Sequence, residues 1–195
     1  MVSKKRVAIL ISGRGSNMTA LIDACRLPDY PAEIVGVGSN RATAPGLEIA
    51  SARGLETFSL AQSQFVDRDA FDAALTQKLD AWNVDIICLA GFMRILTPDF
   101  TVRWAGRLIN IHPSLLPLYR GLDTHARALA DGARVHGCTV HFVTPDLDEG
   151  PTIMQAQVPV LPGDTPDTLA TRILVEEHRI YPEALCLLAS GTLKY

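Results

Sequence analysis

The sequence has little excess charge of either sign and no long apolar segment. Its 195 residues carry 18 lysines and arginines against 21 aspartates and glutamates, a formal net charge of -3. This balance gives no long-range attraction to nucleic acid or anionic lipid, so the sequence predicts neither as a partner. No run of about 18 apolar residues occurs, and the first apolar run stops at Ser12-Gly13. We therefore expect no membrane span, no signal peptide and a cytoplasmic location.

Cysteine pairs at metal-binding or redox spacing are also absent. The four cysteines are far apart in the sequence and form no Cys-x-x-Cys motif. Zinc sites and redox-active pairs depend on such spacings, so the sequence predicts no metal and reduced, buried thiols. These cysteines are Cys25, Cys88, Cys138 and Cys186.

Short apolar runs, rich in β-branched residues, alternate along the chain with amphipathic stretches. Such runs are typical of strands buried on both faces, and the alternation predicts a mostly parallel sheet with helices on both faces. With 195 residues and 48% hydrophobic content, one core is expected, hence a single α/β domain over 1–195. The expected strands are 7–12, 33–38, 85–90, 108–111 and 139–143, and the expected helices are 18–26, 45–53 and 66–82.

The last third of the chain predicts a different strand arrangement. Residues 139–143 and 152–160 are strand-like, and the loop between them is too short to hold a crossover helix. We therefore expect these two strands to pair antiparallel. A helix over 167–180 should follow, with another short one before Leu193.

The turn after the first strand, Ser12-Gly-Arg-Gly-Ser-Asn17, is a candidate phosphate site. Glycines let the backbone approach a ligand, and the N-terminus of the following helix offers free N–H groups to a phosphate. Met18 replaces the third glycine of the dinucleotide fingerprint, and no Gly-Lys-Ser/Thr follows. The pattern favours a single phosphate group over a dinucleotide. A tight turn with a serine or asparagine cap is the alternative.

Two polar side chains lie at the end of the fourth expected strand. Asn110 and His112 are two residues apart, so on a strand they project to the same face, just before Pro113. Open α/β sheets bind ligands at this edge, and an amide with an imidazole can stabilise an oxyanion. The alternative is a hydrogen-bonded structural histidine.

Two loops could complete such a site. Asp148, in the Leu147–Pro151 loop, could favour the charged form of a nearby histidine or direct a proton-carrying water, unless the loop is an ordinary Asp-x-Gly turn. The segment after Gly91 could line a pocket for a flat heterocycle, or simply pack with Arg94 in solvent.

The remaining histidines are expected to be structural. His125 lies in a helical stretch, His136 in a turn region, and His178 after an acidic pair. His141 alternates with apolar residues and could face the same cleft as Asn110.

Taken together, four segments resemble the folate-dependent formyltransferases over essentially the whole chain. The segments are 11–17, 89–96, 110–117 and 147–151. The resemblance implies a Rossmann-like formyltransferase fold and transfer of the formyl group of 10-formyltetrahydrofolate, a co-substrate, to the amino group of glycinamide ribonucleotide in purine biosynthesis. It further implies small-molecule substrates, no metal, and a monomer or homodimer.

The same resemblance implies roles for individual residues. Asn110, His112 and Asp148 match the catalytic residues. The ribonucleotide would be bound by Gly15, Ser16, Asn17 and Glu177, and the folate by Arg68, Met93, Arg94, Ile95, Leu96 and Asn110. Two positions depart from the family pattern: Leu118 stands where many members have a basic residue, and Asp123 where many have histidine.

Two related enzyme classes and one non-enzyme remain as alternatives. Methionyl-tRNA formyltransferase and formyltetrahydrofolate deformylase share the central motifs, but usually carry an additional RNA-binding or regulatory domain for which we expect no room here. The low net charge further weakens the tRNA alternative. A non-catalytic nucleotide-binding module would not need Asn110, His112 and Asp148 together.

Overall fold

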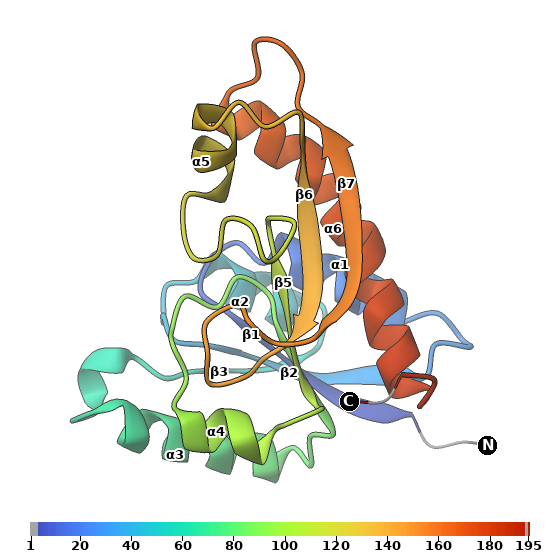
Figure 1. Ribbon diagram of the computed structural model, residues 1–195. Coiled ribbons are helices and arrows are strands. Elements are labelled where there is room, and N and C mark those ends of the chain that lie inside the picture. The colour runs from blue at the N-terminus through green and yellow to red at the C-terminus, as the bar shows by residue number, and fades with distance from the viewer. Residues whose placement is uncertain (1–3, 194) are drawn as a thin grey trace.

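The computed structural model describes residues 4–193 and 195 and contains one sheet flanked by helices (Figure 1). Residues 1–3 and 194, part of the domain expected over 1–195, lie outside the described residues. The strands are β1 (Lys5–Ile11), β2 (Ala32–Ser39), β3 (Glu56–Ser59), β4 (Ile86–Leu89), β5 (Leu108–His112), β6 (Val135–Phe142) and β7 (Thr152–Pro159). The helices are α1 (Ser16–Cys25), α2 (Pro45–Ala52), α3 (Arg68–Ala81), α4 (Pro98–Arg103), α5 (Thr124–Ala130) and α6 (Pro166–Ala189), with a 3₁₀ turn, η1 (Gln62–Gln64).

The seven strands follow the order β3-β2-β1-β4-β5-β6-β7. Pairing is parallel from β3 to β5 and antiparallel between β5, β6 and β7, which confirms the predicted fold class. The chain first builds outward from β1 to β3 and then restarts at β4 on the other side of β1. This reversal leaves a crevice at the carboxyl ends of β1 and β4, the usual ligand position in open α/β sheets.

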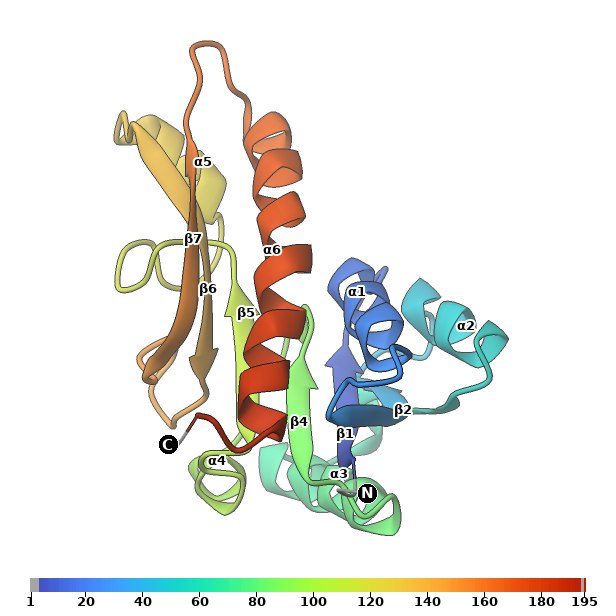
Figure 2. The same cartoon turned by 90° about the vertical axis from the view of Figure 1, so that its right-hand side faces the viewer.

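Helices cover both faces of the sheet, as the alternation predicted. Along β1, Val7, Ile9 and Ile11 pack into the core that includes α1 and α6, whereas Ala8 and Leu10 pack against α3 and α4. Figure 2 shows α6 running along the strands with α1 beside it. Fully burying each aliphatic side chain contributes about 1.5–3 kcal/mol, so both cores hold β1 and β4 rigidly at the centre.

The long C-terminal helix corrects one prediction. We expected a helix over 167–180 and a separate short one, but α6 runs unbroken for 24 residues with Pro182 inside it. An internal proline costs about 3 kcal/mol or more. Burial of Ile180, Tyr181, Ala184 and Leu185 on the two sides of that proline outweighs the cost, because each buries a side chain in the core.

The start of β6 corrects a second prediction, the position of His136. His136 lies on β6 and not in a turn region, because the strand begins at Val135. Gly137 suggested a turn, but it is needed inside the strand, where a Cβ would lie 2.0 Å from the Ala156 carbonyl oxygen of β7.

Within the part of the chain that the structure describes, no helix is long and apolar enough to cross a membrane.

Candidate active site

A cleft of about 680 Å³ opens beside the carboxyl end of β4. Its walls are the segment after β4, the end of β5, the loop before α5, β6 and the loop after β6. This volume lies in the usual range for small-molecule sites, about 300–1,000 Å³. Among the residues expected in the site, those lining the cleft are Met93, Arg94, Ile95, Leu96, Asn110, His112 and Asp148.

His112, the last residue of β5, is 5% exposed, and both of its ring nitrogens face oxygen atoms. Nε2 lies 3.0 Å from the Tyr119 carbonyl oxygen, and Nδ1 lies 3.4 Å from Asp148 Oδ2. Neither a carbonyl nor a carboxylate oxygen can donate a hydrogen bond. Each of these two oxygens can therefore only accept a hydrogen bond, from a protonated ring nitrogen.

Asp148 is held in place by an unusual backbone conformation. Its φ of 54° lies in the left-handed region, which costs a non-glycine residue about 1–3 kcal/mol and recurs at functional sites. Gly150 fixes the loop, since a Cβ there would lie 1.8 Å from the Phe142 carbonyl oxygen. Asp148 Oδ2 also accepts the Gly121 N–H at 2.9 Å. These constraints direct the carboxylate toward His112.

Asn110 is oriented by a histidine directly opposite it on β6. Asn110 and His141 are register partners, and Asn110 Nδ2 lies 3.2 Å from His141 Nε2. His141 Nδ1 lies 2.8 Å from the Phe142 carbonyl oxygen, so that nitrogen carries the proton and Nε2 accepts from the amide. Burial lowers the pKa of His141, against the effects of the Phe142 carbonyl and Asp148, and favours the neutral ring. The second amide hydrogen of Asn110 stays available to a ligand.

The turn after β1 ends in a free helix N-terminus. Gly15 has φ 74° and precedes α1, and among residues 4–193 and 195 no side chain caps this helix. The first turn of α1 also contains no acidic residue, so its backbone N–H groups are available to an anion. Ser12 Oγ accepts the Met93 N–H at 2.7 Å, which joins this turn to the cleft.

Glu177 of α6 contacts Asn17 in the first turn of α1. Its side chain accepts a 2.6 Å hydrogen bond from Asn17 Nδ2, and it is only 7% exposed. Burial raises the pKa of Glu177, and the Asn17 hydrogen bond opposes that shift. Asn17 Oδ1 is buried and, within the described residues, accepts no hydrogen bond. A buried acceptor in this state is common where a ligand or ordered water completes the site.

The remaining expected residues lie outside the lining of the cleft. Gly15, Ser16 and Asn17 lie where the turn after β1 enters α1, Glu177 of α6 contacts Asn17, and Arg68 begins α3; none of these residues lines the cleft itself. The departure residue Asp123 does line it, in a left-handed conformation.

Two more histidines stand near the site. His125 lines the cleft and contacts His136 edge-on, with ring centroids 5.4 Å apart. Burial, and then the charges of His125 and His112, lower the pKa of His136 to about 4. Sequence reasoning assigned His141 no part in orienting Asn110, although its alternation with apolar residues correctly placed it in the cleft.

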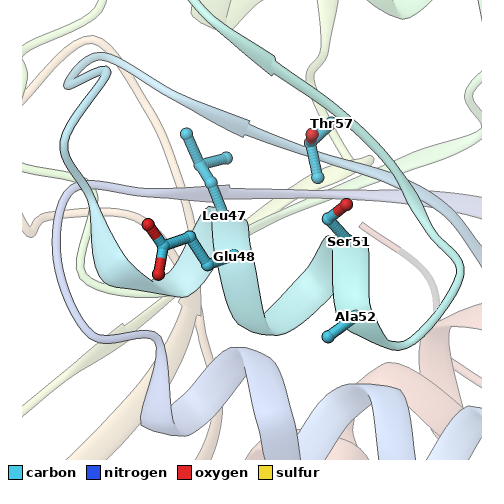
Figure 3. Close-up of a pocket in the computed structure, with 5 residues that line it drawn as sticks. All are labelled: Leu47, Glu48, Ser51, Ala52 and Thr57. Carbon is cyan, nitrogen blue, oxygen red and sulfur yellow. The ribbon is translucent and has the colours of Figure 1, made fainter.

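A second hollow lies between α2 and β3, well away from these groups (Figure 3). It is lined by Leu47, Glu48, Ser51, Ala52 and Thr57. One carboxylate and two hydroxyls on an open surface form no convergent polar group, so the cleft at β5 is the better candidate. Over residues 4–193 and 195, no group of three or more potential metal ligands is found.

Comparison with known proteins gives consistent matches. Residues 5–185 match the family described as formyl transferase. The chain is 49% identical over 188 residues to phosphoribosylglycinamide formyltransferase of Escherichia coli (strain K12), covering 96% of this chain and 89% of that protein. It is 49% identical to the trifunctional purine biosynthetic protein adenosine-3 of Homo sapiens, covering 98% of this chain but 19% of that protein.

The fold is also that of a solved relative. The crystal structure of phosphoribosylglycinamide formyltransferase from Brucella melitensis matches with a TM-score of 0.93 at 52% identity, covering 99% of this chain and 100% of that one. Sequence and fold therefore agree along nearly the whole chain. The protein belongs to the formyl transferase family and is a one-carbon transferase.

Proposed function

We propose that this chain forms a single formyltransferase domain over residues 1–195 and acts on glycinamide ribonucleotide in purine biosynthesis. The formyl donor is 10-formyltetrahydrofolate, and the acceptor is the amino group of the ribonucleotide. The observation that carries this proposal is the convergence of Asn110, His112 and Asp148 in one cleft beside the uncapped N-terminus of α1. The matched relatives support it, since those cited above are named for this activity or for purine biosynthesis.

The two substrates occupy adjoining parts of the site. The ribonucleotide phosphate binds the N–H groups of Gly15, Ser16 and Asn17, where the positive end of the α1 dipole favours an anion. Glu177 contacts the sugar or glycinamide part. The folate occupies the cleft, with its pterin against Met93, Arg94, Ile95 and Leu96, and its tail toward Arg68.

In the reaction, the substrate amine attacks the formyl carbon and the carbonyl oxygen becomes an oxyanion. The charged His112 ring and the free amide hydrogen of Asn110 stabilise that oxyanion. His112 Nε2 lies 3.0 Å from the Tyr119 carbonyl oxygen in the free protein, and the oxyanion replaces that carbonyl as its acceptor when the intermediate forms. Loss of one such donor typically costs about 10²–10³ in rate.

The intermediate then collapses and the bond from carbon to N10 of the folate breaks. The amine proton moves to N10, so tetrahydrofolate and the formylated ribonucleotide leave as neutral amine and amide at the reacting atoms. Asp148, 3.4 Å from His112 Nδ1, holds the imidazolium in place and relays this proton through water. A positioned acid-base group contributes about 10²–10⁴ in rate.

The proposal is tested by following the folate absorbance of the protein mixed with 10-formyltetrahydrofolate and glycinamide ribonucleotide. We expect tetrahydrofolate to form only when the ribonucleotide is present. Formate released by water without an acceptor would instead identify a deformylase. Formylation of methionyl-tRNA in place of the ribonucleotide would identify the tRNA enzyme.

A further inference from the structure

A buried hydroxyl lies where the turn after β1 meets the segment that follows β4. Ser12 is the first residue after β1, is 4% exposed and does not line the cleft. Serine is mostly exposed in folded proteins, and a buried hydroxyl normally has hydrogen-bond partners that account for its position. Here the two partners of the hydroxyl come from the segments after β2 and after β4.

The backbone pairing of β1 with the β4 segment reaches as far as Ser12. The Ala90 N–H donates to the Leu10 carbonyl at 2.9 Å, and the Ser12 N–H donates to the Gly91 carbonyl at 3.0 Å. Gly91 has φ 75°, a left-handed conformation that glycine adopts without strain and that turns the chain away from the sheet. Two residues later the Ser12 side chain holds the segment, because Ser12 Oγ accepts the Met93 N–H at 2.7 Å.

This bond holds the start of one wall of the cleft. Phe92 packs against the core that includes α3 and α4, whereas Met93 and Ile95 line the cleft with side chains that are 59% and 57% exposed. Apolar side chains at the surface of a cleft are suited to contact a flat heterocycle. The Ser12 hydroxyl therefore fixes the backbone from which this wall extends.

Asn40 orients the Ser12 hydroxyl. Ser12 Oγ donates to Asn40 Oδ1 at 2.5 Å, and Asn40, the residue after β2, is itself buried. A serine hydroxyl has one hydrogen, so its donation to Asn40 leaves the lone pairs of the oxygen for the Met93 N–H. Linked hydrogen bonds of this kind also strengthen one another. Ser12 and Asn40 therefore act as one unit on Met93.

The turn that follows Ser12 is held by other hydrogen bonds. The Gly46 N–H of α2 donates to the Gly13 carbonyl at 3.1 Å, and the Thr19 N–H of α1 donates to the Gly15 carbonyl at 2.9 Å. A Cβ at Gly46 would lie 3.0 Å from the Gly13 carbonyl oxygen, so α2 packs closely on the turn. These bonds do not involve the Ser12 side chain, and its removal should leave the turn in place.

The far end of the segment after β4 is also anchored separately. Asp72 Oδ2 on α3 accepts the Thr97 N–H at 2.7 Å. The Thr97 hydroxyl accepts the Phe100 N–H and so caps α4. Ser12 thus holds the near end of a segment whose other end is fixed, and loss of its hydroxyl should shift the wall without unfolding it.

We infer that Ser12 is a positioning residue for the folate donor, because its hydroxyl, oriented by Asn40, fixes the Met93 backbone in the wall that receives the pterin. The inference rests on the proposed function. In this role Ser12 contacts no reacting atom and acts through Met93. A displaced wall weakens binding of the donor in the ground state and in the transition state alike, which raises the KM for the donor and leaves kcat unchanged.

Ser12→Ala tests the inference, since it removes the hydroxyl and keeps the backbone N–H that donates to Gly91. Ser39→Ala is the matched control. Ser39 is a buried serine at the end of β2, and its hydroxyl accepts the Arg41 N–H at 3.0 Å instead of a bond from the cleft wall. Asn40→Ala and the double variant with Ser12→Ala complete the set. Steady-state kinetics are measured with 10-formyltetrahydrofolate and glycinamide ribonucleotide, each varied at saturating concentrations of the other.

Ser12→Ala should raise the KM for 10-formyltetrahydrofolate about tenfold and leave kcat and the ribonucleotide KM within about twofold. Asn40→Ala should raise the same KM by a smaller factor, about threefold, because the hydroxyl remains but is free to rotate. The double variant should match Ser12→Ala, because Asn40 acts through Ser12. Ser39→Ala should match the wild type. Thermal unfolding by circular dichroism establishes that each variant is folded, and Asn40→Ala suffices should Ser12→Ala fail to fold.

A wild-type KM for the donor in folded Ser12→Ala would overturn the inference. So would equal changes in Ser12→Ala and Ser39→Ala, or parallel losses in kcat and in both substrate KM values, which indicate a merely structural role. A double variant worse than Ser12→Ala by the full Asn40→Ala factor would overturn the action of Asn40 through Ser12. Failure of the proposed function is distinguishable, because the wild type would then form no product from 10-formyltetrahydrofolate and the ribonucleotide.

Discussion

The turn after β1 and the cleft after β5 lie at the same edge of the sheet but are built differently. The turn offers backbone N–H groups at the start of α1. The cleft offers titratable side chains, His112, His141 and Asp148, with a strained backbone at the last of these. Backbone N–H groups do not titrate in the working pH range, whereas the chemistry needs groups that exchange protons. Variants in the turn should therefore change substrate affinity, and variants in the cleft should change turnover.

The largest effect that tests this division is expected in the cleft. His112→Ala should lower kcat about 10²–10⁴-fold, because the variant loses both an oxyanion donor and an acid-base group. The KM for the ribonucleotide should change by less than about threefold. Steady-state kinetics with both substrates measures the two parameters separately.

His178→Ala is a suitable control for that variant. His178 is a partly buried histidine of α6 that does not line the cleft, so its removal should leave kcat near the wild-type value. A wild-type kcat in His112→Ala would remove His112 from the proposed mechanism. A large rise in KM without loss of kcat would place it in binding and break the contrast with the turn.

A smaller loss of turnover should follow removal of the histidine that orients Asn110. His141→Ala should lower kcat about tenfold, the value of a hydrogen bond of roughly 1.4 kcal/mol, with little change in either KM. His141 acts through the Asn110 amide, 3.2 Å away, so the double variant with Asn110→Ala should be no worse than Asn110→Ala alone. Losses that multiply would mean that His141 also acts by a second route, either through Asp148, whose Oδ1 lies 3.7 Å from His141 Nε2, or on the reacting atoms directly.

A variant in the turn after β1 should change the affinity for the ribonucleotide and leave turnover unchanged. Gly15 has φ 74°, so Gly15→Ala strains the backbone by roughly 1–2 kcal/mol and shifts the N–H groups at the start of α1. We expect the KM for the ribonucleotide to rise about 5- to 30-fold while kcat stays within about twofold. Gly54→Ala is matched in backbone conformation, since φ is 80° there, but it lacks the contact with Met18 Cε that a Cβ at Gly15 would make at 2.9 Å. Equal effects at Gly54 would attribute the change to lost stability.

The sequence predicted what depends on short-range patterns. Buried strand runs revealed the parallel sheet, and the two-residue spacing of Asn110 and His112 placed both in one cleft. The edge strand β3 was missed because its residues 56–59 are mostly exposed and include no apolar run. The links of Asn110 to His141 and of Asp72 to Thr97 span 31 and 25 residues, so they arise only from strand register and helix packing.

The smallest expected effect concerns Glu177, a buried acidic residue of α6 that contacts Asn17 beside the turn. Burial raises its pKa in the folded protein, so between the ordinary carboxyl pKa and its own the folded state holds more protons than the unfolded one. The free energy of unfolding must then fall as pH rises through this interval.

Glu177→Gln keeps an oxygen for Asn17 and removes this titration. The Tm of this variant should exceed that of the wild type by a few degrees at pH 8 and by less at pH 4.5. For a chain of this size, 1 kcal/mol of unfolding free energy corresponds to about 2–4 °C in Tm. Glu176→Gln, beside it but paired with Arg179 at the helix surface, should show no such gain. An equal gain for Glu177→Gln at both pH values would mean that burial does not raise the pKa of Glu177 in the folded protein.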